Sequence, residues 1–444
     1  MHTLSDSRKL SDSTKQGRCC LTDQNSPKRI MIYTHDTYGL GNIRRMLAIA
    51  QHMGREYPLA QVLVVTGSPM QHSFRVSPGV DFIKLPCLSR DRAGRYQSRG
   101  LDIPLSELVA IRRELIAAAY RHFEPDLLLV DKKPMGVKNE LAGVFQEMDA
   151  QVKRPAVALV LRDILDSPDR TTEIWLRHGY FEMIREYYDL VLVAGQPELF
   201  NVGKEYGFPD HALKKLRYCG YIDGRQYQTT QTQTQPQPPA PQKDCRPGLP
   251  HILVTVGGGE DGGRIIESLV RAMRTSTFTE RPEFTATVIL GPEMPAGQRL
   301  VLRKIGDGVS GLLLEDFSDD MKTQIGVADL VLGMCGYNTV CEVLASGKPL
   351  LAIPRVEPVA EQLIRARRFS ERGLLHFLHP SVLDPITLIE KIKECLSPPS
   401  FLTSSKVTLD FNGLDRIGYW SMHAMEARQQ SAAGYRKRRE YVYA

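Results

Sequence analysis

The feature that most constrains this chain is an alternation of short, continuous apolar runs with amphipathic stretches of helical length. Arg29–Tyr33, Asp126–Val130 and Ala156–Leu161 each contain at least four successive apolar residues, rather than an apolar residue at every second position. Buried parallel strands have this pattern because helices cover both faces of their sheet. The alternation begins near Lys28, stops at Gly224 and restarts at His251. It predicts two doubly wound, Rossmann-like α/β domains.

The remaining elements follow the same pattern. In the first block we predict further strands at Gln61–Thr66, Asp81–Leu85 and Asp189–Val193, and helices at Asn42–Arg55, Leu105–Arg121, Val137–Phe145 and Arg170–Tyr187. In the second block we predict strands at His251–Val256, Thr285–Leu290, Gly311–Leu314, Leu330–Leu332 and Leu350–Pro354, and helices at Gly262–Arg274, Asp319–Val327, Thr339–Ala345, Val359–Arg372 and Asp384–Cys395. Two such domains leave a cleft that faces the carboxyl ends of both sheets.

The segments around these blocks set the predicted domain boundaries. Residues 1–27 are polar and are predicted to be a disordered tail before an N-terminal domain at 28–225. Residues 226–247 include QYQTTQTQTQPQPPAPQ, which has too few apolar side chains to offset its ordering entropy and is predicted to be a disordered linker. A second domain is predicted at 248–396 and a C-terminal extension with a basic tail at 397–444, in which Asp415–Arg428 has an amphipathic pattern.

Charge and cysteine usage exclude several classes of protein. The net charge is +6, but residues 1–29 hold six Lys or Arg against three Asp, and residues 428–444 hold five against one Glu. The body is close to neutral, so nucleic-acid binding is not indicated; the tails are either solvated or contact anionic lipid. No run approaches the ~20 apolar residues of a membrane helix, and the eight cysteines form no C-x-x-C pair. These features predict a cytoplasmic protein with reduced thiols and no zinc site.

A glycine-rich loop follows the first strand of the second domain. The segment Val254–Gly263 reads VTVGGGEDGG and opens a predicted helix. Glycine lets backbone N–H groups approach an anion closely, and a helix N-terminus carries a partial positive charge that suits phosphate. The alternative is a tight strand-to-helix turn with no ligand.

Two further motifs lie where later helices begin near the cleft. Within Gly333–Pro349, Thr339 and Glu342 are three residues apart, which is the spacing of a capping box; alternatively, the Glu342 carboxylate accepts hydrogen bonds from two sugar hydroxyls. Glu361 and Gln362 begin another helix and either face the cleft or form a solvated first turn, where acidic residues are favoured.

The order of these motifs carries a resemblance. The glycine-rich loop, then ADLVLGMCGYNTVCEVLASGKPLLAIP, then E-Q-x-x-R-A resembles the donor-binding half of GT-B glycosyltransferases, closest to family 28, which includes the MurG-like peptidoglycan N-acetylglucosaminyltransferases. The similarity covers residues 250–396 well and the first half chiefly at HDTYGLGNIRR, residues 35–45. The whole chain is similar to a bacterial group of predicted glycosyltransferases related to that family.

The resemblance implies which residues hold a nucleotide-sugar donor. Those beside the diphosphate would be Gly257, Gly258, Gly259, Gly336, Asn338, Thr339 and, from the domain boundary, Arg225. Glu342 would hold the ribose hydroxyls, Glu361 and Gln362 the donor sugar, and Phe317 would lie near the nucleobase.

On the acceptor side, the loop after the first strand is expected to reach the cleft. Gly39 and Gly41 permit close approach of a substrate. The family usually has histidine where this chain has Asn42, and an amide cannot act as a general base. His35 and Asp36 of the same loop are therefore candidates for that role.

Charged residues at two other strand ends point to the same cleft. Asp131 is a further candidate base, and Lys133 and Arg162 could balance the charge of the donor. The alternative for each is a surface loop charge.

The resemblance implies an inverting glycosyltransferase that moves a hexose-type sugar from a nucleotide donor, by default UDP-N-acetylglucosamine, to an acceptor hydroxyl. No D-x-D carboxylate pair is present, so we predict metal-independent chemistry and no cofactor. The acceptor is a lipid-linked sugar, a polysaccharide or a small molecule, and the enzyme would be cytoplasmic, with possible contact to the inner membrane face. The alternatives are a nucleotide-sugar epimerase or hydrolase of the same fold, and a non-catalytic sugar-nucleotide-binding protein.

Overall fold

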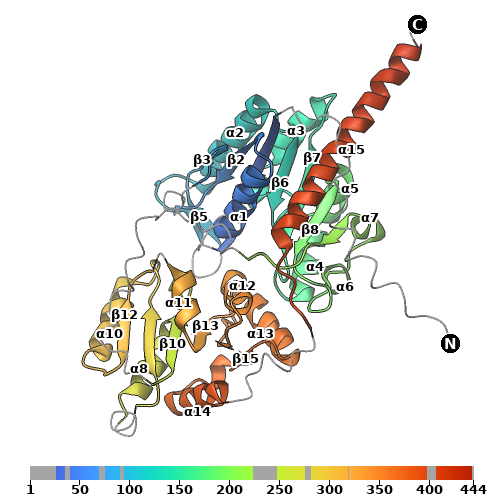
Figure 1. Cartoon of the computed structure of the whole chain (residues 1–444). Coiled ribbons are helices and arrows are strands. Elements are labelled where there is room, and N and C mark those ends of the chain that lie inside the picture. The colour runs from blue at the N-terminus through green and yellow to red at the C-terminus, as the bar shows by residue number, and fades with distance from the viewer. Residues whose placement is uncertain are drawn as a thin grey trace, which may run out of the picture.

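The structure is a computed structural model of the 444-residue chain, and it describes residues 27–35, 41–69, 76–90, 95–223, 248–275, 282–318, 320–397 and 407–442. Two separate parallel sheets, each with its own helices, occupy the two halves of the chain (Figure 1). The predicted fold class of two doubly wound α/β domains is therefore confirmed. The predicted linker at 226–247 lies outside the described residues, as does the predicted tail up to residue 26.

The first sheet has seven parallel strands in the order β3-β2-β1-β6-β7-β8-β9. Their bounds are β1 Lys28–Tyr33, β2 Ala60–Thr66, β3 Val80–Lys84, β6 Leu127–Asp131, β7 Ala156–Arg162, β8 Leu190–Ala194 and β9 Leu216–Tyr218. All five residues of β6 and of β8 are buried, as continuous apolar strands covered on both faces require. The chain order reverses between β1 and β6, and ligands of such sheets bind in the crevice outside this switch point.

The second sheet has six parallel strands in the order β12-β11-β10-β13-β14-β15. Their bounds are β10 His251–Thr255, β11 Thr285–Ile289, β12 Leu312–Glu315, β13 Leu330–Gly333, β14 Leu350–Ala352 and β15 His376–Phe377. Here the order reverses between β10 and β13. The glycine-rich loop follows the first of these strands and the Gly333–Pro349 motif follows the second, so both motifs meet at the switch point.

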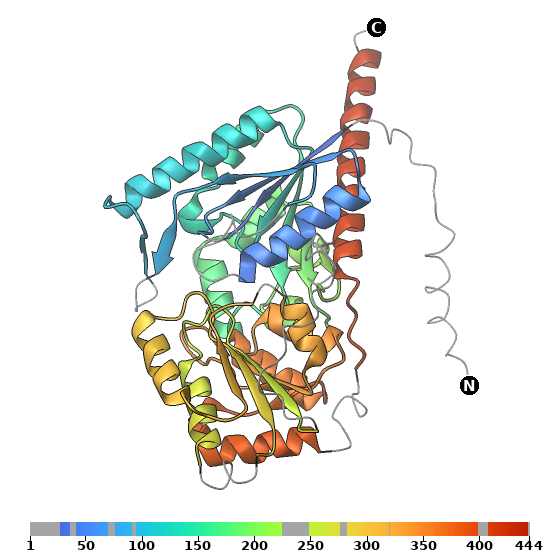
Figure 2. The same cartoon turned by 60° about the vertical axis from the view of Figure 1, so that its left-hand side comes forward.

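Helices cover both faces of each sheet (Figure 2). Those of the first half are α1 Gly41–Glu56, α2 Leu105–Phe123, α3 Ala142–Ala150, α4 Pro168–Arg177, α5 Tyr180–Tyr187, α6 Val202–Glu205 and α7 Asp210–Leu213, with a 3₁₀ turn at Val137–Asn139. Those of the second half are α8 Gly263–Met273, α10 Ala296–Gly306, α11 Met321–Val327, α12 Tyr337–Ala345, α13 Glu361–Glu371 and α14 Pro385–Leu396, with a 3₁₀ turn at Pro380–Val382. A small antiparallel hairpin, β4 Leu88–Arg90 and β5 Tyr96–Ser98, lies beside the first sheet.

The prediction of one helix over Arg170–Tyr187 is wrong. The segment forms α4 and α5, which are separated at Gly179, where φ is +62°. Glycine adopts this left-handed conformation without the clash of a Cβ atom, so it ends one helix and lets the next begin in another direction.

The last helix, α15, spans Gly413–Val442 and is longer than the predicted Asp415–Arg428. Its first half returns to the first domain and packs against α1, β7 and β8, with Ile417 fully buried (Figure 2). Arg428 forms an ion pair of 2.6 Å with Asp189, just before β8. The C-terminal extension is thus part of the hydrophobic core of the N-terminal domain.

Replacing Ile417 with alanine should destabilise the first domain by about 2–4 kcal/mol, because it leaves a cavity between α15 and the sheet. Tyr419→Ala on the same helix removes a side chain that is 59% exposed and serves as the control, with a change near zero. Urea unfolding followed by circular dichroism measures both. Equal stability of the two variants would contradict the packing of α15 described here.

Candidate functional site

The two sheets lie one on each side of the domain boundary (Figure 2). Side chains of the two domains form ion pairs across this boundary. Helices α1 and α12, each of which begins at a switch point, are in contact across it. A buried apolar cluster also continues across the boundary through Tyr221, Ile222, Tyr337 and Phe369. The two domains are therefore packed directly against each other along this part of their boundary.

The glycine-rich loop combines a structural turn with an open backbone. Gly259 has φ +97°, and a Cβ there would lie 2.3 Å from the Leu290 carbonyl oxygen, so packing alone requires glycine. Gly257 has φ +65°, yet nothing lies within 4 Å of the position of its Cβ. The turn alternative thus accounts for Gly259, while Gly257 leaves space in which a ligand can approach the backbone.

Helix α12 begins at Tyr337, with Gly336 as its N-cap and no side-chain cap. Thr339 lies inside the helix, so the capping-box alternative for Thr339 and Glu342 is wrong. The first N–H groups of a helix have no partner within the helix, and the N-terminus carries a partial positive charge that suits an anion. Asn338 and Thr339 lie in the first turn of α12.

Gln362 lies beside the start of α12. A Cβ at Gly336 would be 4.0 Å from Gln362 Nε2, and Gln362 Oε1 accepts a hydrogen bond of 3.0 Å from the backbone N–H of Arg355. The Arg355 side chain in turn donates to Asp261 of the glycine-rich loop at 2.8 Å. The three motifs of the second domain are therefore connected around one point at the carboxyl edge of its sheet.

Both candidate donor carboxylates are paired with arginines of the N-terminal domain. Glu342 is almost completely buried and accepts a hydrogen bond of 2.5 Å from Arg44 of α1. Glu361, also buried, forms an ion pair with Arg162 at the end of β7. The solvated-turn alternative for Glu361 is therefore wrong.

Burial alone would raise the pKa of Glu361, but Arg162 and three further cations more than offset this effect and hold the pKa below its ordinary value. Burial also lowers the pKa of Arg162, although Glu361 opposes that change, while the nearby Arg365 and Arg45 add to it. The surroundings of Arg162 thus favour further negative charge.

The deepest contact between the domains joins Arg365 of α13 to Asp163. Arg365 donates to both Asp163 oxygens, at 2.7 and 2.9 Å, and to the carbonyl of Cys335 at 2.7 Å. Burial lowers the pKa of Arg365, but the Asp163 carboxylate more than compensates, so the pKa lies well above its ordinary value. This bidentate pair fixes α13, and with it Glu361 and Gln362, against the N-terminal domain.

On the acceptor side, Asp131 is fully buried and both of its oxygens have partners. One accepts from Arg45 at 2.5 Å and the other from the backbone N–H of His35 at 3.2 Å. The His35 ring is buried, and its Nε2 lies 3.5 Å from the Tyr96 hydroxyl. Asp131 is thus placed to position the His35 loop, and its surface-charge alternative is excluded by its burial.

The other sequence-predicted residues are less fully described. Asp36, Gly39 and Arg225 lie outside the described residues, and Gly41 and Asn42 open α1. Lys133 follows β6, directly after Lys132, whose φ is +68°. Phe317 lies beyond β12 and is 55% exposed.

Sequence reasoning assigned no role to Arg44, Arg355 or the Arg365–Asp163 pair, although Arg44 and Arg365 lie within the motifs that carry the resemblance. Arg355 follows the buried strand β14, so the rule that singled out Asp131 and Arg162 at strand ends would also have found it. Arg44 and Arg365 lie within helices, where their sequence pattern is that of solvated charges.

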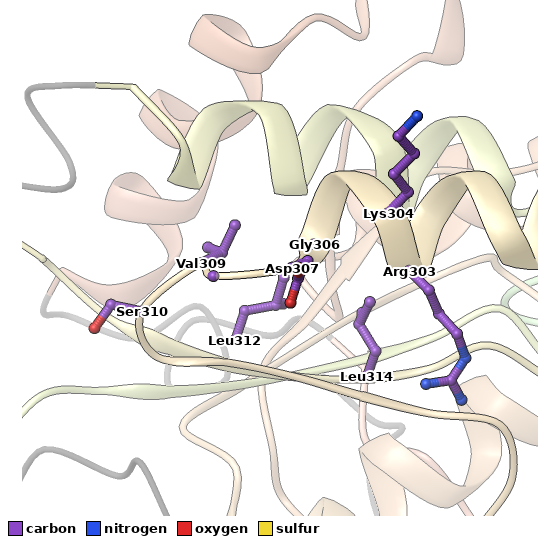
Figure 3. A pocket seen from close by; sticks show the side chains of 9 residues that line it. Arg303, Lys304, Gly306, Asp307, Val309, Ser310, Leu312 and Leu314 are labelled. Carbon is purple, nitrogen blue, oxygen red and sulfur yellow. The ribbon is translucent and has the colours of Figure 1, made fainter.

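A shallow depression elsewhere in the second domain is separate from this site (Figure 3). It lies beside the end of α10 and the amino end of β12, and it is lined by Arg303, Lys304, Gly306, Asp307, Gly308, Val309, Ser310, Leu312 and Leu314. The amino ends of these strands face away from the cleft. Within the described ranges, no helix is long and apolar enough to cross a membrane, and no three His, Cys, Asp or Glu side chains are grouped as metal ligands would be.

Two Rossmann-like domains with facing switch points define the GT-B class. Residues 251–411 match the family model "Glycosyltransferase family 28 C-terminal domain". The predicted relation to MurG-like GT-B proteins of glycosyltransferase family 28 is therefore confirmed.

Similar proteins are consistent with this assignment. The UDP-N-acetylglucosamine--N-acetylmuramyl-(pentapeptide) pyrophosphoryl-undecaprenol N-acetylglucosamine transferase of Glaesserella parasuis is 25% identical over 38% of this chain and 46% of its own length. The chain thus matches about half the length of such relatives.

Solved structures share the fold. MurG of Acinetobacter baumannii aligns with a TM-score of 0.55 and 14% identity over 89% of this chain and all of its own. A UDP-GlcNAc 2-epimerase from Neisseria meningitidis aligns with a TM-score of 0.57 and 12% identity, covering 89% of this chain and 99% of its own.

The Glu361–Arg162 pair should make stability depend on pH in a defined direction. A carboxyl whose pKa is lower in the folded state stabilises the fold above its unfolded pKa, and this contribution is lost as pH falls through the folded value. We therefore expect Glu361→Gln to be less stable than the wild type at pH 7. The difference should shrink below about pH 4.5.

Urea unfolding at a series of pH values measures this difference. Glu371→Gln, at the other end of α13, is the control. A gap between Glu361→Gln and wild type that stays constant down to pH 3 would contradict the pairing.

Proposed function

We propose that the protein is an inverting glycosyltransferase that transfers a hexose-type sugar from a UDP-sugar to an acceptor hydroxyl without a metal ion. The observation that carries the proposal is the meeting of Gly257, the start of α12, Glu342 and Gln362 at one switch point. This set offers backbone donors for a diphosphate beside acceptors for sugar hydroxyls. UDP-N-acetylglucosamine is the first donor to test, since it is named in the Glaesserella relative.

In this mechanism the second domain stabilises the departing nucleotide. The N–H groups at the start of α12 and the open backbone at Gly257 would offset the charge that develops on the diphosphate as the glycosidic bond breaks. Glu342 would orient the ribose, and Glu361 with Gln362 would orient the sugar. Such preorganised donors are an alternative to a bound metal ion for the same task.

The N-terminal domain would activate the acceptor. A base must take the proton of the acceptor hydroxyl as the new bond forms at the anomeric carbon. We assign this role to His35 rather than Asp131, because both oxygens of Asp131 already accept hydrogen bonds from Arg45 and from the His35 backbone. Asp131 then acts through the position of the loop.

Lipid-linked sugars are the first acceptors to test. The Glaesserella relative is named for transfer to a pyrophosphoryl-undecaprenol acceptor. In this proposal the enzyme works in the cytoplasm and meets its acceptor at the membrane surface.

The donor site predicts a specific response to nucleotides. UDP at 100 times its dissociation constant should stabilise the wild type by about 2.7 kcal/mol. Glu342→Gln should lose most of this stabilisation, because an amide replaces one acceptor oxygen and adds a donor at the ribose. Thermal unfolding with a panel of nucleotides and nucleotide sugars measures the effect.

Glu390→Gln, on the exposed side of α14, is the control and should respond like the wild type. If no nucleotide stabilises the wild type, the donor site and the transferase proposal both fail.

Loss of the base should affect turnover and leave donor binding intact. His35→Ala is expected to lower kcat by about 10²- to 10⁴-fold with the UDP dissociation constant unchanged. Transfer to candidate acceptors, followed by mass spectrometry, measures kcat, and calorimetry measures binding. NMR of the sugar product separates the reactions: a 2-epimer or free sugar formed without acceptor would indicate an epimerase or a hydrolase instead.

A further inference from the structure

Arg44 connects the N-terminal domain to the centre of the candidate donor site. It lies in the first turn of α1, and its Nη2 donates to Glu342 Oε1 at 2.5 Å across the cleft. Glu342 is the carboxylate that we assign to the ribose hydroxyls. While this pair exists, one of the two oxygens that would accept the ribose hydroxyls is already hydrogen-bonded.

This pair differs from the buried Arg365–Asp163 pair at the same domain boundary. Arg365 and Asp163 are each 1% exposed and share two hydrogen bonds, so separating them would leave a buried charge uncompensated. Arg44 is 26% exposed and makes one such contact to a carboxylate that is 7% exposed. Arg44 is partly hydrated and can exchange its partner, whereas the buried Glu342 carboxylate needs another donor in its place, such as a ribose hydroxyl. The structure thus combines a fixed pair with an exchangeable one.

The geometry offers Arg44 a second anionic partner. Glu342 is five residues beyond Tyr337, the first residue of α12, which is about 7.5 Å along the helix axis. An arginine side chain is about as long as this distance, so a change of its rotamer moves the guanidinium over the same length scale. The N-terminus of α12 is where the diphosphate of the donor would lie.

We propose that Arg44 is a donor-responsive positioning residue that moves from Glu342 to the diphosphate when the nucleotide sugar binds. In the empty site it occupies the ribose carboxylate. The ribose hydroxyls take its place, and the released guanidinium adds a charge-assisted contact to the diphosphate. Binding of a donor that has both a ribose and a diphosphate thereby creates a contact with the N-terminal domain. This inference rests on the proposed function, since it requires a nucleotide diphosphate in the site.

The test compares a nucleoside with its diphosphate, with uridine and UDP as the probes. Arg44→Gln removes the cation that competes with the ribose for Glu342, so this variant should bind uridine about three- to tenfold more tightly than the wild type. The same variant lacks the contact to the diphosphate, so the affinity advantage of UDP over uridine should fall about tenfold or more. Arg44→Lys keeps the charge and should retain most of that advantage. Calorimetry measures the dissociation constants of uridine and of UDP for the wild type and for each variant.

The matched control is Arg368→Gln, which removes another arginine–glutamate pair between the domains. Arg368 lies 3.1 Å from Glu205 and is 38% exposed. It is seven residues beyond Glu361, about 10 Å along the axis of α13. Its loss should leave both ligands' affinities unchanged. Urea unfolding checks that each variant is folded.

The outcomes separate this inference from the proposed function. Opposite changes for uridine affinity and for the UDP advantage support the exchange of Arg44. Equal weakening of both ligands, or no change in either, by Arg44→Gln and Arg44→Lys overturns it and leaves the proposed function standing. Failure of the wild type to bind UDP overturns both.

Discussion

The relative placement of the two domains depends on the buried ion pair between Arg365 and Asp163. Two parallel guanidinium–carboxylate hydrogen bonds define an orientation as well as a distance, and the third donor of Arg365 binds the Cys335 carbonyl. The ring of Tyr337 packs beside the same guanidinium, 5.8 Å from its centre. Helices α12 and α13 thus meet the N-terminal domain at one fixed point, and every cross-cleft contact is positioned relative to it.

Around that point, oppositely charged side chains are paired within the first domain and between the two domains. Arg45 pairs with Asp131 within the first domain, while Arg162 and Arg44 reach the glutamates of the second. Each carboxylate that could bind a sugar hydroxyl is thus oriented by a cation from the opposite side. Such preorganisation costs no rearrangement of the backbone when a ligand enters.

Much of this arrangement could be predicted from the sequence. Continuous apolar runs such as Leu127–Val130 are sufficient to predict the parallel sheets, because only strands covered on both faces need them. Short edge strands such as Leu216–Tyr218 and His376–Phe377 were missed, since two or three residues carry no periodic signal. The split at Gly179 was missed because an isolated glycine is also tolerated inside helices.

The parts of the site whose residues are close together in the sequence could be predicted, as for the glycine-rich loop and the start of α12. Contacts such as Arg44 with Glu342 depend on how two separately folded sheets are oriented. Nothing in a linear pattern specifies that orientation, because the two residues are 298 positions apart.

The return of α15 to the first domain has a mechanical consequence. The chain passes between the two sheets once after Asp223 and again between α14 and α15. Two covalent crossings, the shared apolar cluster and the buried ion pair therefore hold the two domains together.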